Sequence, residues 1–400
     1  MTLVICTVGG WHTPWDMPAS LYLDRQWISG GERSLYELAA AAASLGHDVE
    51  LRGDLQRRAL DEICAAAGAA PRVGMPSRRP ASDDLVVVPE GWSDPQHYAR
   101  IALSPARAAI MLLAPPGLFG WPFVEGWTPP DPTAVPLDAV GRPEHYRGMT
   151  SLGFELWTNA PVLAAEAEAA GVACRMLAAG DPVPFPDPRP KRLDVAVIEN
   201  NRWAPLARAA LATLDATHVA IPTVDHDRML ELLSEARVLI WPSRIEGFSR
   251  MQTEARAMGT VPVALRSNRF GVGLSGEEGA VVVDDPDDIA PAVRALLDGP
   301  QRLEDLRERA MRSARAQLSW EPFVKRLAEA LDAPWDRSET SGVRSELGAA
   351  IDRTVAGVRE EAAARVDEVE QRFGAFRRRR AVRWAARVAD ALGPTRRRSG

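Results

Sequence analysis

A segment just past the middle of the chain reads as strand, loop, helix and strand in direct succession. The run Ala236–Trp241 is apolar and rich in β-formers, and Pro242 follows it. Phe248–Met258 contains no proline or glycine, and its apolar residues recur at helical spacing until Gly259, where a left-handed C-cap fits. Val261–Leu265 supplies the next strand. This order predicts a buried parallel α/β sheet, in which ligands bind at the carboxyl ends of the strands.

Two carboxylates frame that loop and helix. Glu246 stands just before the helix, and Glu254 lies eight residues later. Eight helical residues rise about 12 Å, whereas the paired carboxyls of a glycosidase lie about 5 to 9.5 Å apart. The wider spacing suits an elongated ligand with hydroxyls at both ends. Gly247 and the free amides of the helix start lie between the acids and suit a phosphate. The spacing favours a nucleotide-sugar; the alternative is a solvated helix face that carries two acids by chance.

The same segment resembles the E-x7-E signature of the retaining glycosyltransferases of family four, which have the GT-B fold. The matching residues are Pro242, Ser243, Arg244, Glu246, Gly247, Phe248 and Glu254. The strand near Val281 and the acidic helix start at 284–289 also look like that family. The opening of the chain is similar as well, with a strand at Leu3–Val8, a helix that begins at Gly30–Gly31, and a second strand after Gly46. The resemblance covers roughly residues 1–333.

The resemblance implies an α/β fold with two Rossmann-like domains that face a cleft. We expect an N-terminal acceptor domain over residues 1–184, a linker over 185–192 and a C-terminal donor domain over 193–333. A helical, basic tail follows over 334–400. The final helix, near Trp320, is expected to cross back to the first domain.

The implied activity is the transfer of a hexose from a nucleotide-sugar, with retention of configuration, to a glycan, glycolipid or small-molecule acceptor. Glu246 is the implied catalytic residue and holds the hexose, while Glu254 holds the ribose hydroxyls. The donor-binding candidates are Gly30, Gly31, Arg202, Ser243, Arg244, Gly247, Phe248, Ser249 and Glu254. Gly30 and Gly31 bring a helix start close to the donor phosphates or to the acceptor; the alternative is a plain helix N-terminus. The resemblance implies no metal and no cofactor besides the nucleotide-sugar co-substrate.

The second domain departs from the family pattern. In the family an arginine and then a lysine clamp the donor diphosphate, and here Arg202 fits the first role while no lysine follows. Charge compensation then falls on Arg202, Arg244 or Arg250 and on helix starts. One strand–helix unit is missing before Thr217, and Ala114 stands near the place of a family histidine. These departures keep open a second hypothesis, a non-catalytic glycosyltransferase-like scaffold subunit that acts through its helical tail.

The loops at 9–30 and 115–148 are expected to decide the acceptor, with His12 and Asp16 as the residues to watch for proton transfer. The tail repeats apolar residues at steps of three or four, which indicates an amphipathic helix or short coiled coil, and it ends in arginine clusters. Such a helix suits an anionic membrane surface or a helical partner. The alternative is a solvated arm.

Composition adds limits on partners and location. The formal net charge of −6 gives no sign of a nucleic-acid partner. The three cysteines are widely spaced, which is typical of reduced thiols in a cytoplasmic protein. No apolar run approaches the ~20 residues of a membrane span. We therefore expect a cytoplasmic protein that binds, if at all, peripherally to the inner face of the membrane.

Overall fold

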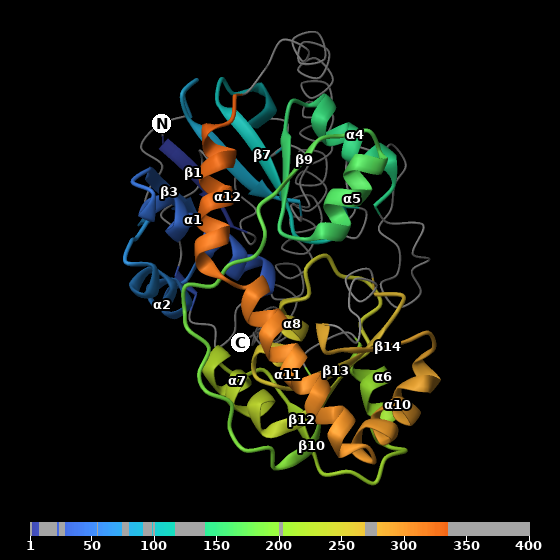
Figure 1. Cartoon of the computed structure of the whole chain (residues 1–400). Coiled ribbons are helices and arrows are strands. Elements are labelled where there is room, and N and C mark those ends of the chain that lie inside the picture. The colour runs from blue at the N-terminus through green and yellow to red at the C-terminus, as the bar shows by residue number, and fades with distance from the viewer. Residues whose placement is uncertain are drawn as a thin grey trace, which may run out of the picture. The chain divides into compact units, whose positions relative to one another are not determined.

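The computed structural model describes most of the chain up to residue 334 (Figure 1). The described residues are 2–7, 22–23, 29–53, 55–73, 80–90, 98, 101–116, 141–199, 203–268 and 278–334. Residues 1–341 form one compact unit. All but the first residue of the tail predicted over 334–400 lies outside the described residues, as do most of the two acceptor loops and His12, Asp16 and Arg202.

The first half of the unit is built on a parallel sheet with the strand order β5-β3-β1-β6-β7-β8-β9. Apolar, β-branched runs make its central strands almost completely buried, as expected for a sheet covered on both faces. The strands are β1 (Thr2–Cys6), β3 (Asp48–Arg52), β5 (Arg72–Val73), β6 (Leu85–Pro89), β7 (Arg107–Leu112), β8 (Glu155–Thr158) and β9 (Cys174–Met176). A separate short pair joins β2 (Tyr22–Leu23) to β4 (Leu55–Gln56).

Helix α1 (Gly30–Ser44) is the most buried helix of this half, because its alanine run lets it pack closely against its neighbours. Ser29 caps it by accepting a hydrogen bond from the backbone amide of Glu32. The remaining helices of this half are α2 (Arg57–Ala67), α4 (Pro143–Ser151) and α5 (Pro161–Ala169). Helix α4 begins inside the segment 115–148, which the sequence predicts to be a loop.

The second half is built on a smaller parallel sheet with the order β11-β10-β12-β13-β14. Its strands are β10 (Leu193–Ile198), β11 (His218–Ile221), β12 (Ala236–Trp241), β13 (Val261–Leu265) and β14 (Val281–Val283). Its helices are α6 (Ala204–Leu211), α7 (His226–Glu235), α8 (Arg250–Ala257) and α10 (Ile289–Leu297), with a short 3₁₀ turn, η4, at Pro286–Asp288. Helix α6 alone connects β10 to β11, which leaves β11 as an edge strand, in keeping with the short domain expected from the sequence.

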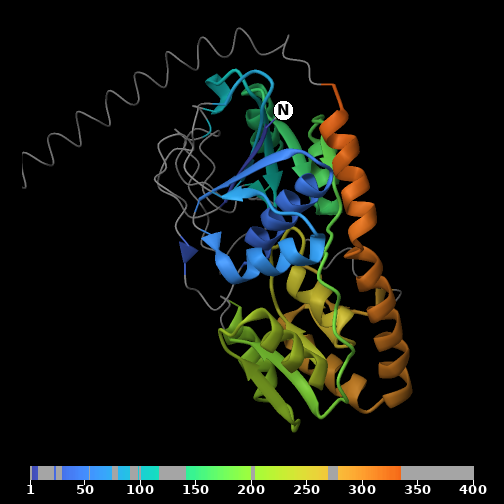
Figure 2. The same cartoon turned by 90° about the vertical axis from the view of Figure 1, so that its left-hand side faces the viewer.

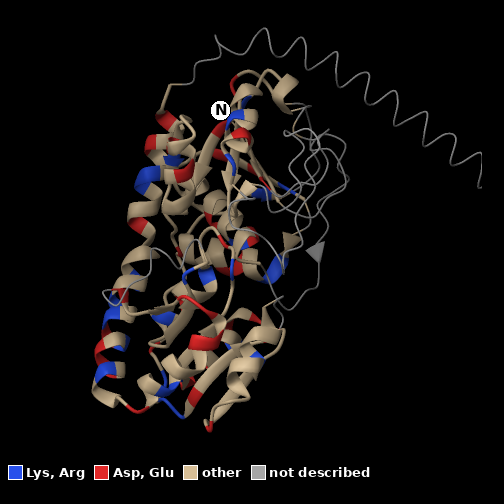
Figure 3. Ribbon diagram, turned by 90° about the vertical axis from the view of Figure 1, so that its right-hand side faces the viewer, with Lys and Arg blue, Asp and Glu red and all other residues tan. Residues whose placement is uncertain are grey.

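The two closing helices run along both halves (Figure 2). Helix α11 (Pro300–Gln317) packs on α8, and α12 (Trp320–Asp332) packs on α1. Phe323 and Leu327 of α12 belong to the apolar core of the first half. Arg107 at the start of β7 donates to the last carbonyls of α12. The return of the last helix to the first domain is therefore confirmed. Figure 3 shows acidic and basic residues interspersed along both helices.

Several predicted element bounds differ from the structure. The strand predicted over Leu3–Val8 is β1, which ends at Cys6. The family resemblance also implies a closing strand of the first domain over Met176–Gly180, but β9 ends at Met176, because Ala178 has a left-handed φ of 66° that interrupts an extended strand. The helix expected from Phe248 begins at Arg250. The strands at 236–241 and 261–265 lie where the sequence predicts them.

Candidate functional site

A cavity of about 430 Å³ opens at the carboxyl ends of strands from both sheets. Its lining combines the start of α1, the loop after β7, the ends of β10, β11 and β12, and the loop and helix that follow β12. The lining residues are Ser29, Gly30, Gly31, Arg33, Leu113, Ala114, Ile198, Ile221, Pro222, Val224, His226, Met229, Trp241, Ile245, Glu246, Gly247, Phe248, Arg250, Met251 and Glu254. The volume lies in the range of small-molecule sites, and the position is the usual one in parallel α/β sheets.

Glu246 enters the cavity from the loop between β12 and α8. Its Oε2 accepts a hydrogen bond from Trp241 Nε1 at 2.9 Å and another from Asn268 Nδ2 at 2.8 Å. Burial raises the pKa of Glu246, and hydrogen bonds from Trp241, Asn268, Ser249 and Gln252 counteract part of that rise. Trp241 and Asn268 donate to the same oxygen and hold the carboxyl group in place.

Glu254 lies in α8 and is buried. Its Oε1 accepts from Arg250 Nε at 2.8 Å and lies 3.0 Å from His226 Nε2. Burial alone would raise the pKa of Glu254, but His226 and then Arg250 lower it to about 2. The side chain is therefore an ionised acceptor at neutral pH.

A buried network of charged groups connects the two halves beside this cavity. Arg250 Nη1 contacts Glu37 Oε2 at 2.6 Å, and Arg250 Nη2 pairs with Asp181. Arg33 Nη2 binds both oxygens of Asp181 at 3.0 Å. Glu254 is the third carboxylate on Arg250. Helix α1 of the first half, the connector after β9 and helix α8 of the second half are thus held by one set of ion pairs.

This network corrects one expectation from the sequence. Arg250 was a candidate for neutralising a donor diphosphate, but its guanidinium already binds three carboxylates. Arg244 does not line the cavity. Among the described lining residues, the arginines are Arg33 and Arg250, and both belong to the network. For an anion the cavity then offers the N-terminal ends of helices α1 and α8, which carry a partial positive charge.

Three glycines allow close approach at the cavity, and two of them, Gly247 and Gly30, do so between the halves. A Cβ on Gly247 would lie 2.4 Å from the carbonyl oxygen of Leu113, a distance that no real side chain tolerates. A Cβ on Gly31 would meet the side chain of Leu113 at 3.2 Å, and one on Gly30 would meet Arg250 Cβ at 3.1 Å. The glycines at this cavity therefore serve contact between protein segments, besides any contact with a ligand.

The loop after β7 is fixed by a buried acid. Glu90 accepts hydrogen bonds from the backbone amides of Leu113 at 2.9 Å and Ala114 at 2.8 Å. Burial raises the pKa of Glu90 to about 7, although these amides and its own backbone amide lower it in part. This is the region where the sequence lacks the family histidine, and Glu90 sets the path of the backbone there.

Most of the residues proposed from the sequence come together in the structure. Glu246, Glu254, Gly30, Gly31, Gly247 and Phe248 line the cavity. Ser243 and Ser249 are buried and do not line it, and Ser249 occupies the N-cap position of α8 without capping the helix through its side chain. Arg202 lies outside the described residues, so its role stays a prediction.

Sequence reasoning missed His226, Glu37 and Asp181. Glu37 lies 213 residues before its partner Arg250, so no local pattern could reveal the pair. The available signal was the position of Arg33 and Glu37, four residues apart on a helix otherwise rich in alanine.

Comparison with solved structures defines the class of fold. The sucrose-phosphate synthase from Thermosynechococcus elongatus matches with a TM-score of 0.56 at 13% identity, over 82% of this chain and 98% of that one. HepE from Anabaena, in complex with UDP and glucose, matches with a TM-score of 0.54 at 12% identity, over 83% and 99% of the two chains. The predicted fold, two parallel-sheet α/β domains of the GT-B type, is confirmed.

Sequence comparison adds a match to the second half. Residues 193–299 match the family model described as "Glycosyl transferases group 1". D-inositol 3-phosphate glycosyltransferase 2 from Catenulispora acidiphila is 36% identical over 102 residues, which is 25% of this chain. The match spans about a quarter of that relative, 24% of its length. The similarity is concentrated in the half that carries Glu246 and Glu254.

Proposed function

We propose that the protein is a glycosyltransferase that takes a sugar from a nucleotide-sugar in the cavity between its two sheets. The observation that carries the proposal is the convergence of Glu246, Glu254 and the starts of α1 and α8 on one cavity. Two carboxylates and two helix N-termini offer acceptors for sugar hydroxyls and donors for a phosphate. The glycosyltransferase match over residues 193–299 supports the same activity.

In this proposal the two acids bind opposite ends of the donor. The hydrogen bonds of Glu254 to Arg250 and His226 fall on Oε1, so Oε2 is the oxygen for the ribose hydroxyls. Trp241 and Asn268 donate to Oε2 of Glu246, and Oε1 is the oxygen proposed for the hexose. Glu246 is the proposed catalytic residue, acting without a metal and with retention of configuration. Arg202 belongs to the proposed donor set, and Ser243, Arg244 and Ser249 are proposed to support it from outside the cavity lining.

The acceptor is proposed to be a glycan, a glycolipid or a small molecule that approaches through the loops at 9–30 and 115–148. The basic tail after residue 334 is proposed to contact an anionic membrane surface from the cytoplasmic side. Among the described residues, no helix is both long and apolar enough to cross a bilayer. Flotation of the full chain with liposomes, with and without anionic lipid, tests the membrane contact. Equal recovery in both would contradict it.

Donor binding is tested by calorimetric titration of the full chain with UDP, GDP and ADP and with their sugar conjugates. The wild-type chain is expected to bind one nucleotide class, and its sugar conjugate more tightly. Glu254→Gln should weaken that binding by about tenfold or more, because a hydrogen bond to a charged group contributes about 1.5–3 kcal/mol. Glu246→Gln should weaken the binding of the sugar conjugate and leave the binding of the free nucleotide unchanged.

Glu329→Gln is the matched control, because Glu329 is an exposed glutamate on α12 away from the cavity. Thermal unfolding of each variant verifies that the fold is kept. Binding of none of the nucleotides by the wild-type chain would contradict the transferase proposal. That outcome is the one expected for a non-catalytic scaffold, a reading that the comparisons do not favour.

A further inference from the structure

His226, at the start of α7, separates the donor cavity from a second cavity of about 310 Å³. Its Nε2 lies 3.0 Å from Glu254 Oε1. An ionised carboxylate only accepts hydrogen bonds, so Nε2 must carry the proton of this pair. In a neutral ring the other nitrogen, Nδ1, then presents a lone pair. Nδ1 is buried and has no hydrogen-bond partner among the described residues. A buried nitrogen in that state calls for a ligand.

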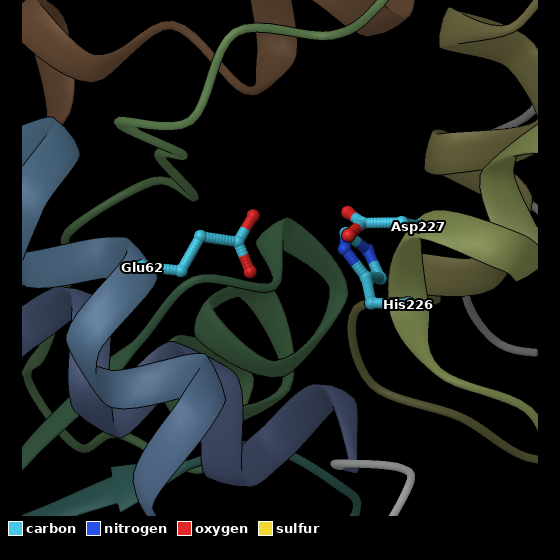
Figure 4. A group of neighbouring side chains, drawn as sticks. All are labelled: Glu62, His226 and Asp227. Atoms are coloured by element: carbon cyan, nitrogen blue, oxygen red, sulfur yellow. The ribbon is translucent and has the colours of Figure 1, made fainter.

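Two carboxylates lie next to this ring. Glu62 reaches across from α2 of the first half, and Asp227 follows His226 on α7 (Figure 4). One ligand atom from each of the three residues lies within 4.8 Å of the others. Glu62, His226 and Asp227 also line the second cavity. We propose that these three side chains form a binding site for a divalent transition-metal cation of the zinc type, joining α2 to α7.

The donor set fits that class of cation. Imidazole nitrogen and carboxylate oxygen are both ligand types of Zn²⁺, and three protein ligands leave a fourth position for water. Ligating histidines regularly donate their second N–H to a carboxylate, and Glu254 already occupies that place on His226. Tetrahedral ligands on zinc lie about 3.4 Å apart at bond lengths near 2.1 Å. Binding therefore requires the three groups to move inward by at most about 1.4 Å.

Asp227 has a competing partner. Its Oδ2 accepts from Arg58 Nη2 at 2.9 Å, and Arg58 also pairs with Asp225 at 3.4 Å. These side chains are largely exposed, and exposed ion pairs contribute little to stability. A cation can therefore bind Asp227 through its other oxygen, or displace Arg58 towards Asp225.

The site would act on the arrangement of the two halves, because its ligands come from helices of both. A cation that binds only when α2 and α7 are close stabilises that arrangement by mass action. It also fixes the tautomer of His226 and, through Nε2, the orientation of Glu254. This role is separate from sugar transfer, and the site can be tested without a nucleotide-sugar.

Titration of the metal-free full chain with Co²⁺, a coloured substitute for Zn²⁺, tests the proposal. We expect one equivalent to bind with the visible absorption of a tetrahedral nitrogen–oxygen site, and Zn²⁺ to displace it. Glu62→Gln and Asp227→Asn should each weaken Co²⁺ binding at least about tenfold, because even an outer partner of a metal ligand contributes that much. Both residues are partly or largely exposed, so neither variant threatens the fold.

Glu231→Gln is the matched control. Glu231 lines the same cavity but does not belong to the three-residue cluster, so its loss should leave Co²⁺ affinity unchanged. No stoichiometric binding at millimolar Co²⁺ would overturn the proposal, and is the result expected if His226 is doubly protonated between the carboxylates. Equal affinity in Glu62→Gln, Asp227→Asn and the wild type would overturn it too. A strong ultraviolet charge-transfer band would assign the metal to a cysteine and count against the site.

Discussion

Arg250 stands at the first position of α8, where the family resemblance places donor contacts, yet its partners are protein carboxylates. Buried pairs of this kind are costly to break, at about 3–5 kcal/mol, because the remaining charge is left unpaired in a poor solvent. The network has three acids against two arginines, with His226 at its edge. One acid therefore lacks a full counter-charge, and its ionised form is disfavoured.

Glu37 is that acid, and we predict that its protonation makes the stability of the protein depend on pH. Burial raises the pKa of Glu37 to about 8, against opposing effects of Arg250 and Arg33, from an ordinary value of 4.5. The folded chain then keeps a proton that the unfolded chain loses between these values. The stabilisation from this group is complete below about pH 4.5 and is lost as the pH rises towards 8.

Glu37→Gln removes that titration. The variant should lose less stability than the wild type between pH 5.5 and pH 8, and the difference cannot exceed about 1.4 kcal/mol per pH unit. Urea unfolding at several pH values measures it, with Glu329→Gln as the control for loss of an exposed glutamate. An identical pH slope in Glu37→Gln and the wild type would contradict the assignment.

At the scale of elements, the start of α1, the loop after β7 and the loop before α8 meet at the cavity. Gly31 and Gly247 both face Leu113, but with different consequences. A Cβ on Gly31 meets the end of the Leu113 side chain at 3.2 Å, and this side chain can move. A Cβ on Gly247 meets the Leu113 backbone oxygen at 2.4 Å, and Glu90 holds that backbone in place.

We therefore expect Gly247→Ala to destabilise the protein by about 1–3 kcal/mol, the usual cost of overpacking. Gly31→Ala should be close to neutral, because the helix preference for alanine, about 0.5–1 kcal/mol, offsets the small adjustment of Leu113. Chemical unfolding of both variants measures the difference. Equal changes in stability for the two variants would mean that the backbone of the loop after β7 moves as easily as the Leu113 side chain, and would contradict the prediction.

The sequence predicted these elements better than their contacts. Strand 236–241, strand 261–265 and the placement of Glu246 and Glu254 on one cavity followed from local periodicity, which the chain shows directly. The contact of Glu254 with His226 did not, since His226 lies on another helix, and neither did the contact of Arg250 with Glu37 of the first half. Such contacts are set by the packing of whole helices, and one sequence carries no local signal for them. The predicted end of the strand β9 was wrong for a backbone reason, the left-handed conformation of Ala178.

At the scale of the molecule, the last helix of the compact unit packs on the first half of the chain instead of the half that precedes it. Helix α11 completes the second half, while α12 inserts Phe323, Leu327 and Leu331 into the core of the first half. The connector from β9 to β10 carries Asp181, which binds Arg33 of α1 and Arg250 of α8. The halves therefore exchange elements, and neither has a complete core without the residues that follow β14. A boundary at residues 185–192 separates the sheets in the sequence without separating two independent cores.

This exchange predicts how the protein responds to truncation. A chain that ends after Gln317 lacks α12 and three large core side chains, each contributing about 1.5–3 kcal/mol of burial. Their sum approaches the whole stability of an ordinary domain, so this chain should fail to fold cooperatively. A chain that ends after Ser341 keeps the compact unit and should unfold at the midpoint of the full protein. Circular dichroism and urea unfolding compare the three chains. Cooperative unfolding of the shorter truncation near the wild-type midpoint would contradict the role assigned to α12, and a lower midpoint for the longer one would show that residues 342–400 add stability to the folded unit.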